Sequence, residues 1–174
     1  MDRFASPADN SSHLHLRAGN IVVDLGAGSG HYTFEVAKKL KELDAHLSEA
    51  HAGSVYAVDV QKNLLEKIKQ EAHRLGLGNV SVIWGDVDVA GGSKLANHIA
   101  DSVIVSNVLF QSEHKKEFLE EANRLLKPGG EMLIIDWQDK LKVEDILSII
   151  PKNLSKLEQF DAGSHHFGLI FKKS

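Results

Sequence analysis

The sequence has no cysteine among its 174 residues. Without thiols the chain can form no disulfide, no thiolate-bound zinc site and no cysteine nucleophile. It also has no run approaching about 18 apolar residues, so we expect no membrane span. The first residues lack the basic start and apolar stretch of a secretory signal. Together these absences predict a cytoplasmic protein.

Positive charge is also in short supply. The chain has 20 Lys and Arg against 24 Asp and Glu, which gives a formal net charge of −4 and a pI of about 6.2. Nonspecific nucleic-acid binding needs a concentrated basic surface, so this balance argues against nucleic acid as a partner. The two lysine clusters, in 38–41 and 115–116, fall in helical patterns with glutamate nearby. Such clusters are typical of solvated helix faces.

The histidines do not indicate a metal site. His13 and His15, like the adjacent pair His165 and His166, are spaced for metal binding only on extended chain. Adjacent side chains of a strand point to opposite faces of the sheet. Because no cysteine or paired carboxylate motif lies nearby, we predict no metal.

The most informative pattern lies in residues 20–30. Apolar residues 21–23 run into Asp24, and glycine then follows at every second position, at Gly26, Gly28 and Gly30. A buried strand that turns sharply into a helix needs such glycines, because they permit positive φ and leave no Cβ between backbone and ligand. The free N–H groups at the start of the next helix favour a negative group in this turn.

The glycine spacing distinguishes two cofactors. A dinucleotide fingerprint reads G-x-G-x-x-G/A, and its third small residue packs helix against strand. His31 stands at that third position here, and the pattern is instead G-x-G-x-G with an acid two residues upstream. In these residues the chain resembles the class I S-adenosylmethionine-dependent methyltransferases, whose first motif has this form.

Apolar runs and helical patterns alternate along the rest of the chain. We predict strands at 21–25, 54–58, 80–84, 102–108 and 131–136, and two further strands at 154–160 and 167–172. We predict helices from about residue 32 and at 63–75, 115–126 and 143–150, with a short, weak helix at 93–98 and a turn at 127–130. Residues 1–12 read as a loose, flexible lead-in to a single domain, 1–174.

This order predicts an α/β fold. Five β/α alternations followed by a hairpin indicate a Rossmann-like, doubly wound sheet. The resemblance implies seven strands, mostly parallel, with an antiparallel C-terminal hairpin. Ligands of such sheets bind beyond the carboxyl ends of the strands. Polar residues stand at four of those ends: Asp24, Asp59, Asp86 and Ser106.

The segments around these residues occur in the order typical of class I methyltransferases, and most resemble the ubiquinone- and menaquinone-biosynthesis subgroup. The resemblance implies S-adenosylmethionine as cofactor and S-adenosylhomocysteine as product. It implies a role for each matching residue. The glycine turn (Gly26, Ala27, Gly28, Gly30) passes under the methionine part and ribose, Asp59 binds the ribose hydroxyls, and Val60 and Gln61 lie beside the adenine. Asp86 accepts from the adenine amino group, the Val87 amide meets a ring nitrogen, and the Ser106 carbonyl receives the ammonium, with support from Asp24. His31 caps the helix or touches the cofactor carboxylate.

The sequence leaves the methyl acceptor open. We expect a small-molecule or lipid-like acceptor; an RNA or protein methyltransferase and a cofactor-binding module without activity are the alternatives. No catalytic residue is assigned. Only about 20 residues precede the first strand, whereas relatives carry a longer covering segment. The acceptor site is then open, or is covered by the N-terminus or by a second subunit in a homodimer, with 87–92 as a flexible wall.

Overall fold

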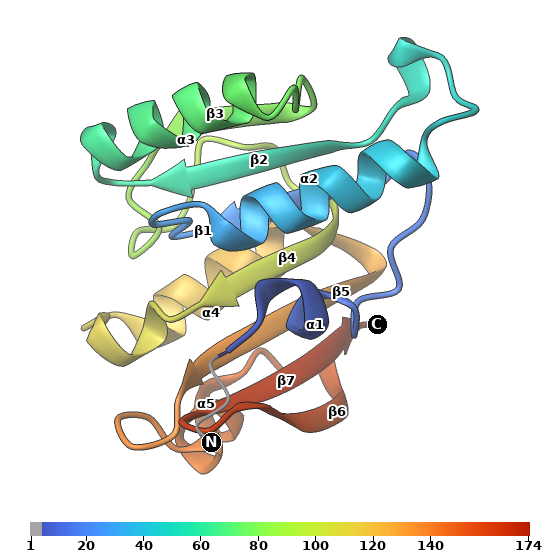
Figure 1. The fold of residues 1–174 in the computed structure, drawn as a ribbon. Helices are drawn as coiled ribbons and strands as arrows, with labels where there is room; N and C mark the ends of the chain where they lie inside the picture. Colours follow the sequence, from blue (N-terminus) through green and yellow to red (C-terminus); the bar gives the residue numbers. More distant parts are fainter. Residues whose placement is uncertain (1–4) are drawn as a thin grey trace.

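A computed structural model describes residues 5–174 (Figure 1). The elements in chain order are α1 (Pro7–Ser11), β1 (Ile21–Leu25), α2 (His31–Leu43), the 3-10 turn η1 (Glu49–His51), β2 (Ser54–Asp59), α3 (Lys62–Arg74), β3 (Val80–Trp84), β4 (Ala100–Ser106), the 3-10 turn η2 (Leu109–Gln111), α4 (Lys115–Leu125), β5 (Leu126–Trp137), α5 (Val143–Ile149), β6 (Leu154–Gly163) and β7 (His166–Lys173).

The strands form one seven-stranded sheet in the order β3-β2-β1-β4-β5-β7-β6 (Figure 1). All neighbours are parallel except β7, which runs antiparallel to both β5 and β6. The predicted fold is confirmed. The chain winds outward from β1 to β3 and then returns to the other side of β1 to form β4. The order of strands therefore reverses between β1 and β4, and a ligand crevice is expected beside this point.

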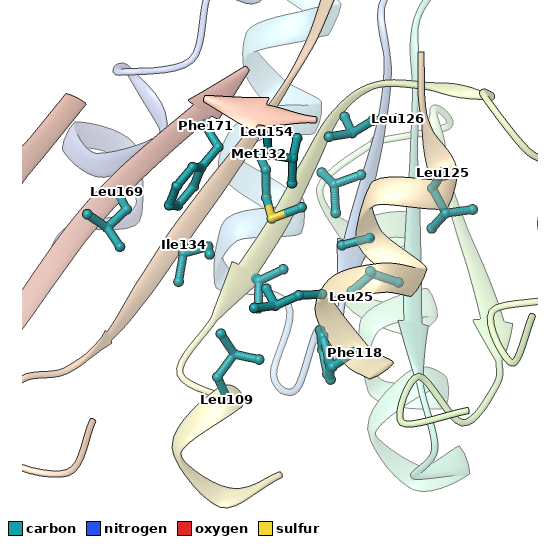
Figure 2. Packing of buried hydrophobic residues seen from close by; sticks show 14 of the residues in the cluster. Leu25, Leu109, Phe118, Leu125, Leu126, Met132, Ile134, Leu154, Leu169 and Phe171 are labelled. Atoms are coloured by element: carbon teal, nitrogen blue, oxygen red, sulfur yellow. The ribbon is translucent and has the colours of Figure 1, made fainter. Parts of the chain in front are cut away.

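Both faces of the central strands are buried, which is why their sequences read as continuous apolar runs. Neighbouring residues of one strand pack on opposite faces: Val22 joins the core under α2 and α3, while Val23 joins the core under α4 and α5. Figure 2 shows part of the second core, where Phe118 of α4 lies near Leu25 of β1. This double burial fixes the strand ends against the helices that follow them.

Three predicted elements are wrong in detail. Residues 93–98 form no helix, because Lys94 and His98 have φ of 61° and 54°, which a right-handed helix does not accommodate. The predicted strand 102–108 is displaced: β4 ends at Ser106, because Asn107 also turns into the left-handed region with φ of 54°. The turn expected at 127–130 lies inside β5 as a bulge, since Ala100 pairs with Leu126 and Ser102 with Glu131.

The N-terminal segment differs from the loose lead-in that we expected. Residues 1–4 lie outside the described residues, but Pro7–Ser11 forms α1, with Ser6 as its N-cap. The side-chain amide of Asn10 is buried and donates to the Tyr32 hydroxyl (3.0 Å) and to the Ala162 carbonyl (3.1 Å). These bonds attach α1 to α2 and to the end of β6.

Candidate functional site

A cavity of about 440 Å³ opens at the carboxyl ends of β1, β2, β3 and β4. Small-molecule sites commonly have volumes of about 300–1,000 Å³. All the predicted site residues except Asp24 and Gly30 line this cavity: Gly26, Ala27, Gly28, His31, Asp59, Val60, Gln61, Asp86, Val87 and Ser106. Residues distant in the sequence thus meet where the order of strands reverses.

The glycine turn is attached to β2 by hydrogen bonds. The amides of Gly26 and Ala27 both donate to the Val58 carbonyl, at 2.8 and 3.0 Å. The Gly28 amide donates to Oδ2 of Asp59 (2.9 Å), and the other oxygen, Oδ1, accepts from the Gln61 amide (2.8 Å). A carboxylate has about four lone-pair positions, so each oxygen of Asp59 retains capacity for one further donor.

Two glycines of this turn have different tasks. The nearest atom that a Cβ on Gly28 would meet beyond its chain neighbours is the Gly26 carbonyl oxygen at 4.0 Å, so its backbone lies open to the cavity. A Cβ on Gly30 would come within 2.8 Å of Ile68 and 3.0 Å of Phe34. Gly30 therefore permits α2 to pack closely against α3, and it is not among the described residues that line the cavity.

Asp24 lies behind the turn rather than in the cavity. Its side chain is buried, and Oδ2 accepts from the Thr33 hydroxyl at 2.7 Å while Oδ1 has no partner among the described residues. Burial, with a smaller contribution from the charge of Asp59, raises its pKa from 3.8 to about 6. Asp24 is bonded to Thr33 at the start of α2 and is not among the residues that line the cavity. Any support that it gives a bound ligand is therefore indirect.

Helix α2 presents its N-terminus to the cavity. Gly30 is its N-cap and has no side chain to cap the first turn, and the Thr33 amide of that turn bonds Asp24. The N–H groups that precede Thr33 are the ones that can donate to an acceptor atom of a ligand. His31 is exposed and lines the cavity, but it does not cap the helix, which was one of the two roles predicted for it. A ligand carboxylate is the group that this helix end suits.

The N-terminal segment, which the sequence offered as one possible cover of the acceptor site, contributes to the cavity wall. Ala5 and Pro7 line the cavity beside Tyr32, whose hydroxyl accepts from Asn10. Burial raises the Tyr32 pKa to about 12, so this side chain stays protonated at neutral pH. No motif marks residues 5–7, and only the packing of α1 brings them to the site.

The wall after β3 consists of Asp86, Val87 and Asp88. Oδ1 of Asp86 accepts from the Asp88 amide (3.0 Å), and Asp88 in turn accepts from the Ser112 hydroxyl (2.8 Å). Asp88, which reads in the sequence as a plain turn residue, lines the cavity and ties this wall to the segment after β4.

The segment after β4 supplies a polar wall. Asn107, Gln111 and Ser112 line the cavity beside Ser106. The side-chain oxygen of Asn107 is buried without a hydrogen-bond partner among residues 5–174. A buried amide oxygen without a partner costs free energy unless a ligand or water supplies a donor. Its place in the cavity wall and its left-handed backbone make Asn107 a candidate ligand contact.

Asp136, near the end of β5, is hydrogen-bonded to this segment. Its two oxygens accept from the amides of Phe110 (3.2 Å) and Trp137 (2.8 Å). Burial raises its pKa to about 6, although these amides oppose the rise. The bond to Phe110 holds η2, which brings Gln111 into the cavity.

The charge of the cavity has one sign. Its acidic side chains are Asp59, Asp86 and Asp88, and no lysine or arginine is among the described residues that line it. Residues 5–174 also contain no cluster of three or more ligating side chains that could hold a metal ion. The cavity therefore favours a cationic or neutral ligand.

Comparisons with known proteins agree with this geometry. A family described as a methyltransferase domain matches residues 16–167. An arsenite methyltransferase of Aquipseudomonas alcaligenes is 31% identical over 142 residues, which cover 76% of this chain and 38% of that protein. The chain belongs to the class I S-adenosylmethionine-dependent methyltransferases. S-Adenosylmethionine is the cofactor of this family.

More distant similarities extend along nearly the whole methyltransferase chain. A ubiquinone/menaquinone biosynthesis C-methyltransferase of Hydrogenovibrio crunogenus is 27% identical over 162 residues, covering 87% of this chain and 58% of that protein. The crystal structure of a methyltransferase from Aquifex aeolicus has a TM-score of 0.79 at 23% identity, covering 97% of this chain and 89% of that one. The chain thus spans 38% and 58% of the two curated relatives, and no helix in its described part is long and apolar enough to cross a membrane.

The cavity fits the cofactor of this family in its chemistry. Gly28 leaves bare backbone beside Asp59, whose oxygens each have capacity for one more donor, as a ribose diol requires. The uncapped start of α2 suits the carboxylate of the methionine part. The carboxylates around the cavity suit the positive charge of the cofactor.

Proposed function

We propose that this protein transfers a methyl group from S-adenosylmethionine to a small-molecule or lipid-like acceptor. The observation that carries the proposal concerns Asp59, whose two oxygens each accept one backbone amide. It lies beside the open backbone of Gly28, where the order of strands reverses. Backbone at one end and carboxylates at the other are what a compound with an amino-acid part and a ribose requires.

Each lining residue then has a role in binding. Asp59 accepts from the two ribose hydroxyls, and the exposed Val60 packs beside the adenine. Asp86 accepts from the adenine amino group while the Val87 amide donates to the ring. The Ser106 carbonyl accepts from the methionine ammonium. Gln61, Ala27 and Gly26 complete the walls.

The protein contributes binding and orientation. When bound, the cofactor supplies a methyl group already activated by its sulfonium, so the chain needs no nucleophile of its own. The cavity walls hold the acceptor in line with the methyl group and exclude water. The segment after β4 faces this position, and its neutral groups, Asn107, Gln111 and Ser112, orient the acceptor by hydrogen bonds.

The charge of the cavity supports an acceptor without negative charge near the methylated atom. Three carboxylates and no cation among the described lining residues disfavour a phosphate or a sugar-phosphate backbone. One relative is named for arsenite, but trivalent arsenic is a soft centre that prefers thiolates, and this chain contains no cysteine. A neutral nucleophile is the acceptor that these groups suit best.

Two experiments test the proposal. Calorimetric titration should detect S-adenosylmethionine and S-adenosylhomocysteine binding with micromolar affinity, and NAD should not compete. Labelled methyl from the cofactor should then appear in organic extracts of small molecules and lipids incubated with the protein. Binding of NAD in place of S-adenosylhomocysteine would contradict the cofactor assignment. Label found in RNA or protein instead would contradict the acceptor class.

A further inference from the structure

The carboxylate of Glu121, on α4, is fully buried and points at the connection between β3 and β4. Its Oε2 accepts from the Gly91 amide (2.8 Å), and its Oε1 accepts from the amide and hydroxyl of Ser93 (3.2 and 2.6 Å). A buried charge is costly unless its lone pairs are satisfied, and here the connection between the strands satisfies them.

Arg124, one turn further along α4, completes this cluster. Two of its nitrogens donate to Glu121, at 2.8 and 2.7 Å. Its third nitrogen, Nη1, donates to the Leu95 carbonyl (2.9 Å) and to the side chain of Asn97 (2.6 Å). Hydrogen bonds to Arg124, Ser93 and Gly91 outweigh the effect of burial and lower the pKa of Glu121 to about 2. The pair therefore remains ionised throughout the neutral range.

The connection that this pair holds, 85–99, contains no helix or strand. It begins with Asp86 and Val87, which line the cavity. The part after them folds back: a Cβ on Gly92 would overlap the carbonyl oxygen of Asp86, so the backbones of residues 86 and 92 are in direct contact. Glu121 accepts from the residues on both sides of Gly92, and Gly92 packs against the Asp86 backbone. The bonds to Glu121 therefore also restrain the position of Asp86.

We propose that Glu121 and Arg124 are positioning residues of the cofactor site. They touch neither cavity nor ligand, but they hold the 85–99 connection so that Asp86 and Val87 meet the adenine. The proposal rests on the proposed function, since it assigns the adenine to Asp86. It also replaces the expectation that 87–92 is a flexible wall, because residues 91 and 93 are bonded to a helix of the core.

The same chain offers a matched control. Glu71 and Arg74 on α3 have the same spacing and the same two-pronged pairing, at 2.8 and 2.6 Å. Arg74 is exposed and Glu71 is partly exposed, and neither side chain bonds a loop within residues 5–174. Glu71→Gln therefore removes one carboxylate from a helical ion pair without altering the connection between β3 and β4.

The experiment compares Glu121→Gln, Ser93→Ala and Glu71→Gln with the natural chain. Calorimetry measures affinity for S-adenosylhomocysteine and for S-inosylhomocysteine, in which the adenine amino group is replaced by oxygen. We expect Glu121→Gln to weaken S-adenosylhomocysteine by about tenfold and to reduce the preference for it over the inosyl compound by at least about threefold, the equivalent of one misplaced hydrogen bond. Ser93→Ala should act in the same direction, and Glu71→Gln should change neither value.

The change in preference separates positioning from stability. Loss of folded protein lowers the apparent affinity for both compounds equally and leaves their ratio unchanged. An unchanged ratio in both Glu121→Gln and Ser93→Ala would overturn the proposal. If Glu121→Gln does not fold, Ser93→Ala, which removes one hydroxyl, decides the matter.

Amide hydrogen exchange of the ligand-free protein provides a test without cofactor. We expect the peptide spanning 86–93 to exchange faster in Glu121→Gln and Ser93→Ala, and at the natural rate in Glu71→Gln. Should the natural chain bind neither nucleoside, the proposed function fails, and exchange still decides whether Glu121 holds the connection. Natural exchange rates in both loop variants would refute that hold.

Discussion

Replacement of Asp59 by asparagine is the sharpest test of the candidate site. Each of its oxygens already accepts one backbone amide, from Gly28 or Gln61. An asparagine offers one oxygen and one donating nitrogen, so one of those amides faces a second donor. The variant also loses the charge that receives the ribose hydroxyls. A hydrogen bond to a charged group contributes about 1.5–3 kcal/mol, so we expect S-adenosylhomocysteine to bind about 10- to 100-fold more weakly.

Asp44 is the matched control for this change. It is as buried as Asp59, each 7% exposed, and its two oxygens also accept one amide each, from Gly19 and Gly53, both at 2.7 Å. It lies at the other end of the sheet, before β2. Asp44→Asn should lower stability in urea unfolding as Asp59→Asn does, but calorimetry should find its cofactor affinity unchanged. Equal affinities for both variants, whether natural or weakened, would refute the ribose assignment.

Three further predictions concern single residues. The pKa of Asp24 is about 6 in the folded state and 3.8 in the unfolded state, so the free energy of unfolding falls by about 3 kcal/mol as pH rises through this window. In urea unfolding, the stability of Asp24→Asn relative to the natural chain should therefore increase from pH 4 to about pH 7. A constant difference would contradict the burial argument. Gly30→Ala should lower stability by about 1–3 kcal/mol more than Gly129→Ala, since both have φ near 80° but only Gly30 faces side chains closer than 3.4 Å; equal melting temperatures would exclude the packing role. Asn107→Gly keeps a left-handed backbone accessible, so unfolding should change by less than about 1 kcal/mol and cofactor affinity should be unchanged while the acceptor KM rises; an unchanged KM would remove Asn107 from the acceptor wall.

The sheet could be predicted from the sequence because its signals are local. The central strands are covered on both faces and read as apolar runs, as at 21–23 and 103–105, and polar residues mark their carboxyl ends. The glycine turn can also be predicted from the sequence, because its spacing reflects the close approach of the backbone to a ligand. The lining residues at the ends of β1, β2 and β3 can therefore be predicted from the amino-acid pattern alone.

The remaining features depend on contacts between distant segments. Glu121 looks like any glutamate of a surface helix, although its position three residues after Phe118 and four before Leu125 puts it on the buried face. What accepts it there is the 85–99 connection, whose path has no periodic signal. Helix α1 is five residues long and is held by one buried asparagine. No local pattern reports such a contact.

The two aspartates that each accept a pair of amides explain why position decides function here. Around Asp44 the chain is closed: a Cβ on Gly53 would lie 2.5 Å from the Asn20 carbonyl oxygen and 3.2 Å from Asp44 itself. Around Asp59 the backbone is open, because Gly28 has no such neighbour and the cavity begins there. The same acid–amide arrangement joins two loops at one end of the sheet and faces a cavity at the other. The carboxyl ends of the parallel strands leave that space beside the point where the order of strands reverses. Of these two aspartates, the one that faces a cavity is Asp59, which ends a strand, whereas Asp44 follows a helix.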